Sequence, residues 1–156
     1  MNPKSAFLLS SVVACFFIAA TPAASAQANP AAPASDTAVP AGLRVAYHVD
    51  DVGSLRNAMN NINNQLTATP NASISLVANG RGIFSLVGGE RDRQGEFASA
   101  IAGLQARGVR FVACGMSMKK HNIAESSLIA NVSTVPSGVV ELTRLQGAER
   151  YAYIKP

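Results

Sequence analysis

A single cysteine has the clearest capacity for covalent chemistry in this sequence. Cys114 directly follows the apolar stretch 109–113 and precedes Gly115, where we expect a helix to begin. Backbone N–H groups at a helix start and nearby positive charge both favour the thiolate, which is the nucleophilic form of cysteine. The basic side chains that follow are Lys119, Lys120 and His121. A second interpretation, an inert cysteine that packs as a small apolar group, stays open on these grounds.

The other chemical candidates lack a partner that their chemistry requires. The turn Gly80-Arg81-Gly82 has neither the third glycine of a dinucleotide loop nor the lysine of a P-loop. Asp50-Asp51 would suit an acidic magnesium pocket, but Cys114 stands where a phosphate-accepting carboxylate would be needed, so we interpret this pair as a helix cap. The side chains that could bind a metal show no recognised ligand spacing, and they are His48, Asp50, Asp51, Cys114 and His121. We therefore predict neither a metal nor a cofactor, and we expect His121 on a solvated helix face.

The elements that must position Cys114 alternate between strand and helix. Strands are predicted over 43–49, 73–78, 109–113, 131–135 and 151–154 from their β-branched and aromatic content. Helices are predicted over 52–66, 91–107, 117–129 and 137–145, whereas 80–89 fits either a short helical turn or a short strand. This alternation predicts an α/β domain with a parallel sheet and helices on both of its faces.

The loops at the carboxyl ends of these strands are the expected place for a functional site. In a parallel α/β sheet, ligands bind at that end of the strands. The loops are 48–54, 79–82, 114–117 and 136–138. Around Cys114 we expect a substrate pocket formed by His48, Asn79, Gly80, Gly115 and Ser117.

Composition divides the 156 residues into three segments. Residues 1–26 have the basic start, the apolar run and the Ala24-Ser25-Ala26 site of a secretory signal peptide. Residues 27–41 are rich in alanine and proline and predict a flexible tether, which leaves 42–156 as the folded domain. We expect a periplasmic or secreted protein with no stable membrane anchor after cleavage, since the apolar run is shorter than the roughly 20 residues of a membrane span.

The net charge of +4 is spread along the chain rather than gathered in one segment. Most arginines stand singly, and acidic residues separate the pair Arg91 and Arg93. Nucleic-acid binding proteins carry a basic stripe, often with aromatic side chains between the charges. We therefore predict no nucleic-acid partner.

Several motifs together make the chain resemble the DsrE/DsrF-like family. They are Tyr47-His48, the segment 76–83, the strand 109–113 with Cys114-Gly115, the segment 135–142 and the ending Tyr151-Ala152-Tyr153-Ile154-Lys155-Pro156. The resemblance implies a three-layer α/β/α domain with a mostly parallel five-stranded, flavodoxin-like sheet, and assembly into trimers or hexamers. In the sulfur-relay members a cysteine after the third strand carries sulfur as a persulfide, and Cys114 stands at that place. This sequence continues with Met116-Ser117-Met118 where those members have an Arg-Gly helix start.

Two functions therefore compete at the level of sequence. The first is thiol or sulfur handling outside the cytoplasm, with persulfide carriage on Cys114 and a thiol or persulfide partner protein. The second is a non-catalytic oligomeric binding or scaffold module in which Cys114 is inert. Whether the protein is an enzyme stays open.

Overall fold

The computed structural model describes residues 42–156. The predicted signal peptide (1–26) and tether (27–41) lie outside the described residues. Within the described part, no helix is long and apolar enough to cross a membrane.

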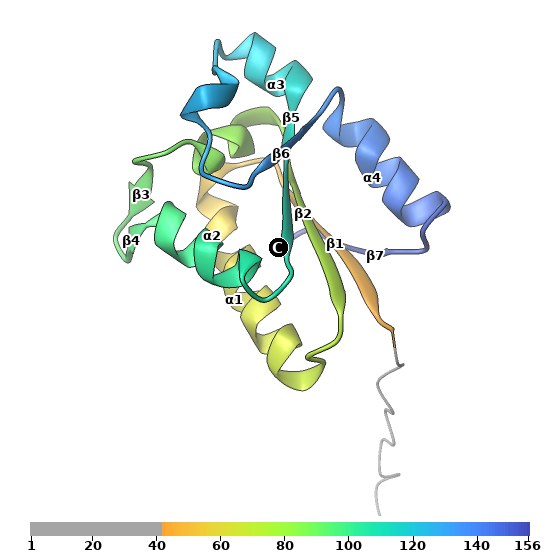
Figure 1. Cartoon of the computed structure of the whole chain (residues 1–156). Coiled ribbons are helices and arrows are strands. Elements are labelled where there is room, and N and C mark those ends of the chain that lie inside the picture. The colour runs from red at the N-terminus through yellow and green to blue at the C-terminus, as the bar shows by residue number, and fades with distance from the viewer. Residues whose placement is uncertain (1–41) are drawn as a thin grey trace, which may run out of the picture. The chain divides into compact units, whose positions relative to one another are not determined.

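Five strands form one parallel sheet in the order β6-β5-β2-β1-β7. The strands are β1 (Arg44–Val49), β2 (Ser73–Ala78), β3 (Arg91–Asp92), β4 (Gly95–Glu96), β5 (Arg110–Cys114), β6 (Ser133–Val135) and β7 (Ala152–Ile154). The helices are α1 (Val52–Ala68), α2 (Phe97–Gln105), α3 (Gly115–Lys120) and α4 (Gly138–Gly147), with 3-10 turns η1 (Gly80–Leu86) and η2 (Glu125–Ser127). The predicted α/β class with a parallel sheet is confirmed, and Figure 1 shows α4 on the opposite face of the sheet from α1 and α2.

The two faces of the sheet are covered very unequally. On one face α1 and α2 bury large side chains, among them Tyr47, Met59 and Phe111, in the main hydrophobic core. On the other face α4 alone packs Leu142 and Leu145 against small strand side chains, and these are Ala46, Val77 and Val112. Because β2 and β5 are covered on both faces, they are apolar along most of their length. The thin α4 layer holds the candidate site.

One predicted helix is wrong at its beginning. The helix expected over 91–107 starts only at Phe97, because 91–96 forms the small β3–β4 hairpin. Gly95 at that hairpin has a φ of +116°, which favours glycine. Arg56 of α1 holds the hairpin with a two-pronged ion pair to Asp92, at 2.8 and 2.9 Å. The pairing partner is distant in sequence, and local helical periodicity does not reveal it.

Five further predictions from the sequence have different outcomes in the structure. The helix predicted over 117–129 is shorter, since α3 ends at Lys120 and Asn122 adopts a left-handed φ of +53°. The ambiguous stretch 80–89 forms the 3-10 turn η1, and 139–145 lies in helix α4 as predicted. Asp51 caps α1 by accepting a hydrogen bond from the Gly53 N–H at 2.8 Å. Ser137 stands at the start of α4, but its side chain makes no capping hydrogen bond.

The turn after β2 is fastened to the end of β1 by main-chain contacts. The Gly82 N–H donates to the Asp50 carbonyl oxygen at 2.9 Å, and the Asn79 N–H donates to that of Val49 at 3.0 Å. A Cβ atom at Gly82 would lie 2.2 Å from the Val49 carbonyl oxygen. Only glycine therefore allows η1 to lie this close to β1.

We expect Gly82→Ala to lower the free energy of unfolding by about 2–3 kcal/mol, because the backbone of β1 cannot move away from the added methyl group. Denaturant unfolding measures this change. Gly103→Ala is the matched control. Nothing lies within 4 Å of the added Cβ there, and the exposed α2 site should gain up to about 1 kcal/mol. Equal effects of the two substitutions would contradict the close approach.

Candidate thiol site at the carboxyl ends of the strands

Strand register places four side chains of the site on the α4 face of the sheet. Within this face, His48 pairs in register with Val77, and Val77 pairs with Val112. Side chains alternate between the two faces along a strand. Asn79 lies two residues after Val77, and Cys114 two residues after Val112, so both point to the α4 face. Tyr153 of β7 stands opposite Ala46, two residues before His48, and joins them. These side chains therefore cross the sheet near its carboxyl edge.

Cys114 is buried, with 4% of its surface exposed, and lies among hydrogen-bond donors. Burial raises the pKa of the thiol. The Ser117 hydroxyl and the N–H groups of Gly138, Ser117 and Met116 favour the thiolate and lower that pKa, and together they outweigh burial. The net direction is a pKa below the ordinary value of 9.0. The arrangement thus supports a thiolate in a site that is nearly closed to water.

Ser117 is oriented by a second contact. Its Oγ accepts a hydrogen bond from the Gly80 N–H at 2.8 Å. Because this N–H occupies a lone pair of the oxygen, the hydroxyl proton is left to point elsewhere, toward the thiol. Gly80, which has a φ of +52°, thereby acts on Cys114 through Ser117.

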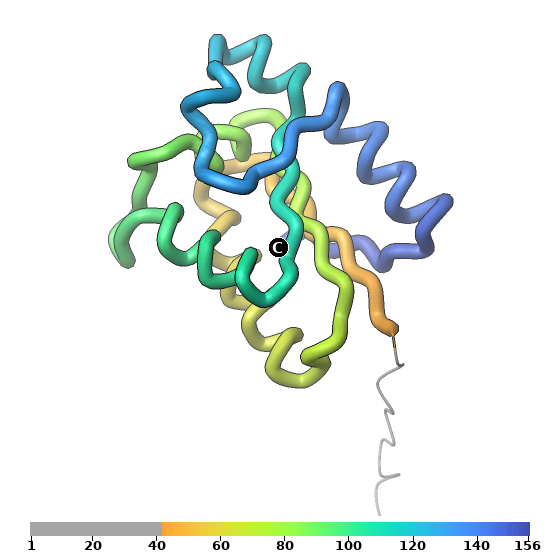
Figure 2. The backbone as a smooth tube through the Cα atoms, in the orientation of Figure 1, coloured from red at the N-terminus to blue at the C-terminus, as the bar shows by residue number. Residues whose placement is uncertain are grey.

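Two glycines let the loop before α4 approach the thiol closely. A Cβ atom at Gly138 would lie 3.0 Å from the Cβ of Cys114 and 3.3 Å from that of Asn79. A Cβ at Gly115 would lie 3.0 Å from the Val135 carbonyl oxygen. The Met116 N–H also donates to the Pro136 carbonyl oxygen at 3.2 Å. Figure 2 shows the chain passing from β6 over the end of β5 into α4. The Gly138 N–H is among the groups that lower the pKa of the Cys114 thiol.

A chain of polar side chains leads from the site to the surface. His48 contacts Asn79 through Nε2, 2.9 Å from Oδ1, and Tyr153 through Nδ1, 2.7 Å from Oη. Asn79 is half-buried and Tyr153 is 43% exposed. Nearby, Lys155 donates to Asp50 and lowers the pKa of that carboxyl. Asp50 is therefore paired at the rim of the site.

The five predicted pocket residues stand in different relations to Cys114, and His48 on β1 is separated from it by β2. His48 and Asn79 bond to each other, Gly80 and Ser117 bond to each other, and Gly115 provides space. Sequence reasoning placed neither Gly138 nor Tyr153 in the pocket. The loop 136–138 at a strand end pointed to Gly138 in the sequence, whereas only the strand register brings Tyr153 to the site.

The basic residues after Cys114 differ from expectation. Lys119 and Lys120 are exposed and are not among the groups that shift the thiol pKa. His121 is half-buried and packs on Phe84, with ring centroids 4.9 Å apart, so the prediction of a solvated face is wrong for this residue. The thiol pKa is therefore lowered by hydrogen bonds rather than by these charges.

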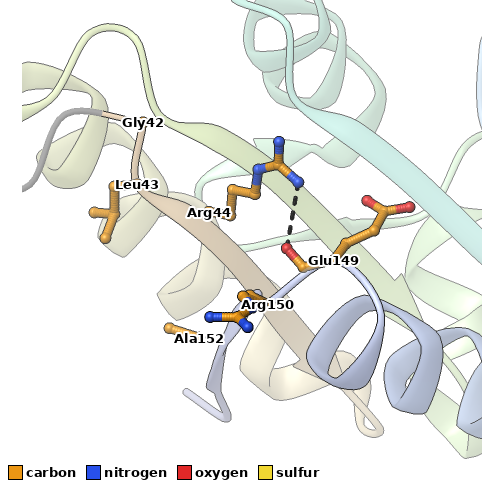
Figure 3. A pocket seen from close by; sticks show the side chains of 6 residues that line it. All are labelled: Gly42, Leu43, Arg44, Glu149, Arg150 and Ala152. Atoms are coloured by element: carbon orange, nitrogen blue, oxygen red, sulfur yellow. Dashed lines mark hydrogen bonds between the residues drawn. The ribbon is translucent and has the colours of Figure 1, made fainter.

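Two recesses of the described part do not include the thiol among their lining residues. A cavity of about 490 Å³ lies at the amino end of the sheet, where Arg44 donates to the Glu149 carbonyl oxygen at 3.3 Å and Arg150 lies nearby (Figure 3). A smaller one of about 170 Å³ lies beside the loop that covers Cys114, between Val135 and Val140. Residues 42–156 contain no group of three or more His, Cys, Asp or Glu side chains placed to hold a metal. The thiol site is thus the candidate with defined chemistry.

A buried carboxylate fastens α4 to the sheet. Glu141 is 6% exposed and accepts hydrogen bonds from Arg144, at 2.7 and 2.9 Å, and from Arg110 of β5, at 2.5 Å. The Arg144 contact, opposed by burial and assisted by Arg110, lowers the pKa of Glu141 to about 2. Arg110 also donates to the buried Ser75 hydroxyl at 2.9 Å. Since Glu141 lies one turn after Gly138, this network holds the start of α4 over Cys114.

We expect Glu141→Gln to lower the free energy of unfolding at pH 7 by about 2 kcal/mol, with half-exposed arginines limiting the loss. The folded pKa of about 2 lies below the ordinary 4.5, so the carboxylate stabilises the fold fully above pH 4.5 and loses this effect as pH falls toward 2. Unfolding measured across that range should show a larger loss in the parent protein than in the variant, in which the other paired carboxylates still titrate. Glu125→Gln, an exposed site, is the control, and an unchanged acid limb in Glu141→Gln would contradict the assignment.

We expect Ser117→Ala to raise the pKa of Cys114, because the thiolate loses a hydroxyl donor. Alkylation by iodoacetamide at neutral pH should slow about 3- to 10-fold, since only the thiolate reacts. Mass spectrometry of the Cys114 peptide follows the reaction separately from Cys15. Ser127→Ala, which removes an exposed hydroxyl, should leave the rate unchanged. An unaltered pH profile in Ser117→Ala would show that the hydroxyl does not act on the sulfur.

Comparison with known proteins agrees with this architecture. No curated protein matches the chain. A protein of unknown function from Methanobacterium thermoautotrophicum, MTH1491, is 29% identical with a TM-score of 0.64, over 73% of this chain and 99% of that one. The ychN protein from E. coli shares the fold, with 17% identity and a TM-score of 0.59, over 74% of this chain and 98% of that one. The model of the DsrE/DsrF-like family matches residues 43–156, nearly the whole described domain, and the chain therefore belongs to the DsrE/DsrF-like family.

Proposed function

We propose that this protein is a sulfur carrier that holds sulfane sulfur as a persulfide on Cys114. The observation that carries the proposal is a buried thiol packed against the start of α4, where a Cβ at Gly138 would lie 3.0 Å from that of Cys114, with the Ser117 hydroxyl and nearby main-chain N–H groups lowering its pKa. Donors in that arrangement favour the thiolate, which is the form that attacks sulfur. Membership of a family that includes sulfur-relay proteins supports the same function.

The proposed cycle has two exchange steps. In loading, the Cys114 thiolate attacks the outer sulfur of a sulfane donor, a new S–S bond forms, and the donor's own bond to that sulfur breaks. The electron pair of that bond leaves with the donor remnant as a thiolate or sulfite. In unloading, an acceptor thiolate attacks the outer sulfur and Cys114 returns to its thiolate. No external oxidant or reductant is needed, because one S–S bond replaces another.

Burial suits a carrier of this kind. With 4% of its surface exposed, Cys114 is shielded from bulk water and oxidants. The start of α4 packs directly on the thiol, since a Cβ at Gly138 would lie 3.0 Å from that of Cys114. Access by a partner thiol then requires movement at the start of α4.

Compartment and assembly are part of the proposal. The signal-like residues 1–26 support export to the periplasm or the medium, with donor and acceptor thiols found there. Three apolar side chains near the site are largely exposed, and they are Met116 (64%), Val139 (63%) and Val140 (66%). Large exposed apolar side chains are often found at protein–protein contacts. They support a homo-oligomer, a trimer or hexamer, or the docking of a thiol partner.

A second candidate is a non-catalytic oligomeric binding or scaffold module with an inert cysteine. The same low exposure of Cys114 and the same exposed apolar side chains favour it. The two candidates differ in whether the Cys114 thiol is reactive. A scaffold needs neither a lowered thiol pKa nor sulfur transfer.

We expect incubation of the full chain with inorganic polysulfide to add one sulfur atom to Cys114, as read by mass spectrometry of the peptide that contains it. A thiol acceptor added afterwards should remove it. Cys114→Ser removes the thiol with little change in volume and should take up no sulfur. Wild-type protein that stays unmodified, together with slow alkylation at every pH below 9, would favour the scaffold instead.

A further inference from the structure

The Tyr153–His48–Asn79 contacts define which atoms carry protons. The Asn79 Oδ1 atom can only accept, so the His48 Nε2 atom 2.9 Å away must donate. In the neutral ring Nδ1 is then an acceptor, and the Tyr153 hydroxyl 2.7 Å away donates to it. The tilted rings of Tyr153 and His48, with centroids 5.8 Å apart, also pack on each other. With the Asn79 amide oriented as in the structure, this arrangement of protons satisfies both contacts.

In this arrangement the amide nitrogen of Asn79 makes no hydrogen bond to His48 or Tyr153. Its two N–H groups are donors, and the Asn79 oxygen is already occupied by His48. Asn79 and Cys114 lie on either side of Gly138, whose missing Cβ would touch the Cβ atoms of both. Asn79 is not among the groups that favour the Cys114 thiolate. Its amide is thus close to the site but not engaged by the resting sulfur.

We propose that Tyr153 and His48 are positioning residues that orient Asn79, so that its amide N–H donates to the negative charge leaving the sulfane donor. The inference rests on the proposed function. In the loading step the electron pair of the broken bond moves to the donor remnant, which becomes an anion. A fixed donor aimed at this charge stabilises the transition state more than the ground state. The substrate class is a small sulfane compound with an anionic leaving group.

The orientation depends on Tyr153 because an amide can turn over. The Tyr153 phenol can donate to Nδ1 or accept from it, but its acidic O–H makes it a stronger donor than acceptor, so it favours the Nε2–H tautomer. Without the phenol this preference is lost, and more of the imidazole carries its proton on Nδ1 while Nε2 accepts from the turned Asn79 amide. The amide nitrogen would in that state face His48 rather than the site. Tyr153→Phe keeps the ring and removes only the hydroxyl. The loss of one hydrogen bond corresponds to about a 2- to 10-fold change in the population of the oriented state.

The test compares Tyr153→Phe with Tyr47→Phe in the full chain. Tyr47→Phe is the control: it also removes one hydroxyl hydrogen bond, the 2.8 Å contact with Gln65, but on the opposite face of the sheet. We expect Tyr153→Phe to slow polysulfide loading of Cys114 about 2- to 10-fold, and to leave iodoacetamide alkylation at the wild-type rate. Nitrogen NMR of His48 should show a smaller share of the Nε2–H tautomer. Tyr47→Phe should change none of the three.

Asn79→Asp is a second variant, because it keeps an acceptor for His48 and removes the amide donors. Its loading rate, divided by its alkylation rate to correct for the added charge, should fall further than that of Tyr153→Phe, while the Nε2–H tautomer persists. Equal loading by wild type and Tyr153→Phe would overturn the inference, as would parallel losses of loading and alkylation. Failure of the wild type to take up sulfur would instead overturn the proposed function, and the tautomer measurement would still test the positioning pair.

Discussion

The close contact between the start of α4 and the strand ends is the constraint on which the site depends. Gly138 packs where a Cβ would touch both Cys114 and Asn79, and only this approach brings its N–H to the thiol. The apolar support beneath α4 is thin, with Leu142 and Leu145 on small strand side chains. Glu141, buried and bonded to two arginines, supplies the missing attachment. The ion pair between Arg110 and Glu141 holds α4 on the sheet, and one turn earlier the same helix places Gly138 against the thiol.

The thiol environment combines two opposing effects. Burial disfavours the charged form, whereas preoriented hydrogen-bond donors favour it and prevail. Peptide N–H groups and a serine hydroxyl held by Gly80 need little reorganisation when charge forms. Surface lysines would be screened by salt and water. A thiolate held away from solvent is therefore stabilised better by fixed donors than by surface charges.

The sequence predicts the alternation of elements well because each has its own period of apolar residues. The helix at 52–66 and the strand at 73–78 bury their side chains toward the core as the pattern requires. It fails at 91–96, where a hairpin is held by an ion pair to Arg56, thirty-six positions from Asp92. It fails again after Lys120, where Asn122 adopts a left-handed conformation that ends the helix. Both errors arise where a tertiary contact or a single backbone angle overrides local propensity.

By itself, the sequence determined that a cysteine ends a buried strand, that glycine-containing loops end its neighbours, and that these ends share one edge of a parallel sheet. Only the tertiary structure decided the strand order and the partners across it. β7 returns to lie beside β1, so Tyr153 meets His48 although 105 positions separate them. Arg110 likewise meets Glu141 across the layer between β5 and α4. Such contacts depend on which elements pack against one another, and the apolar periodicity of a single segment does not determine its packing partner.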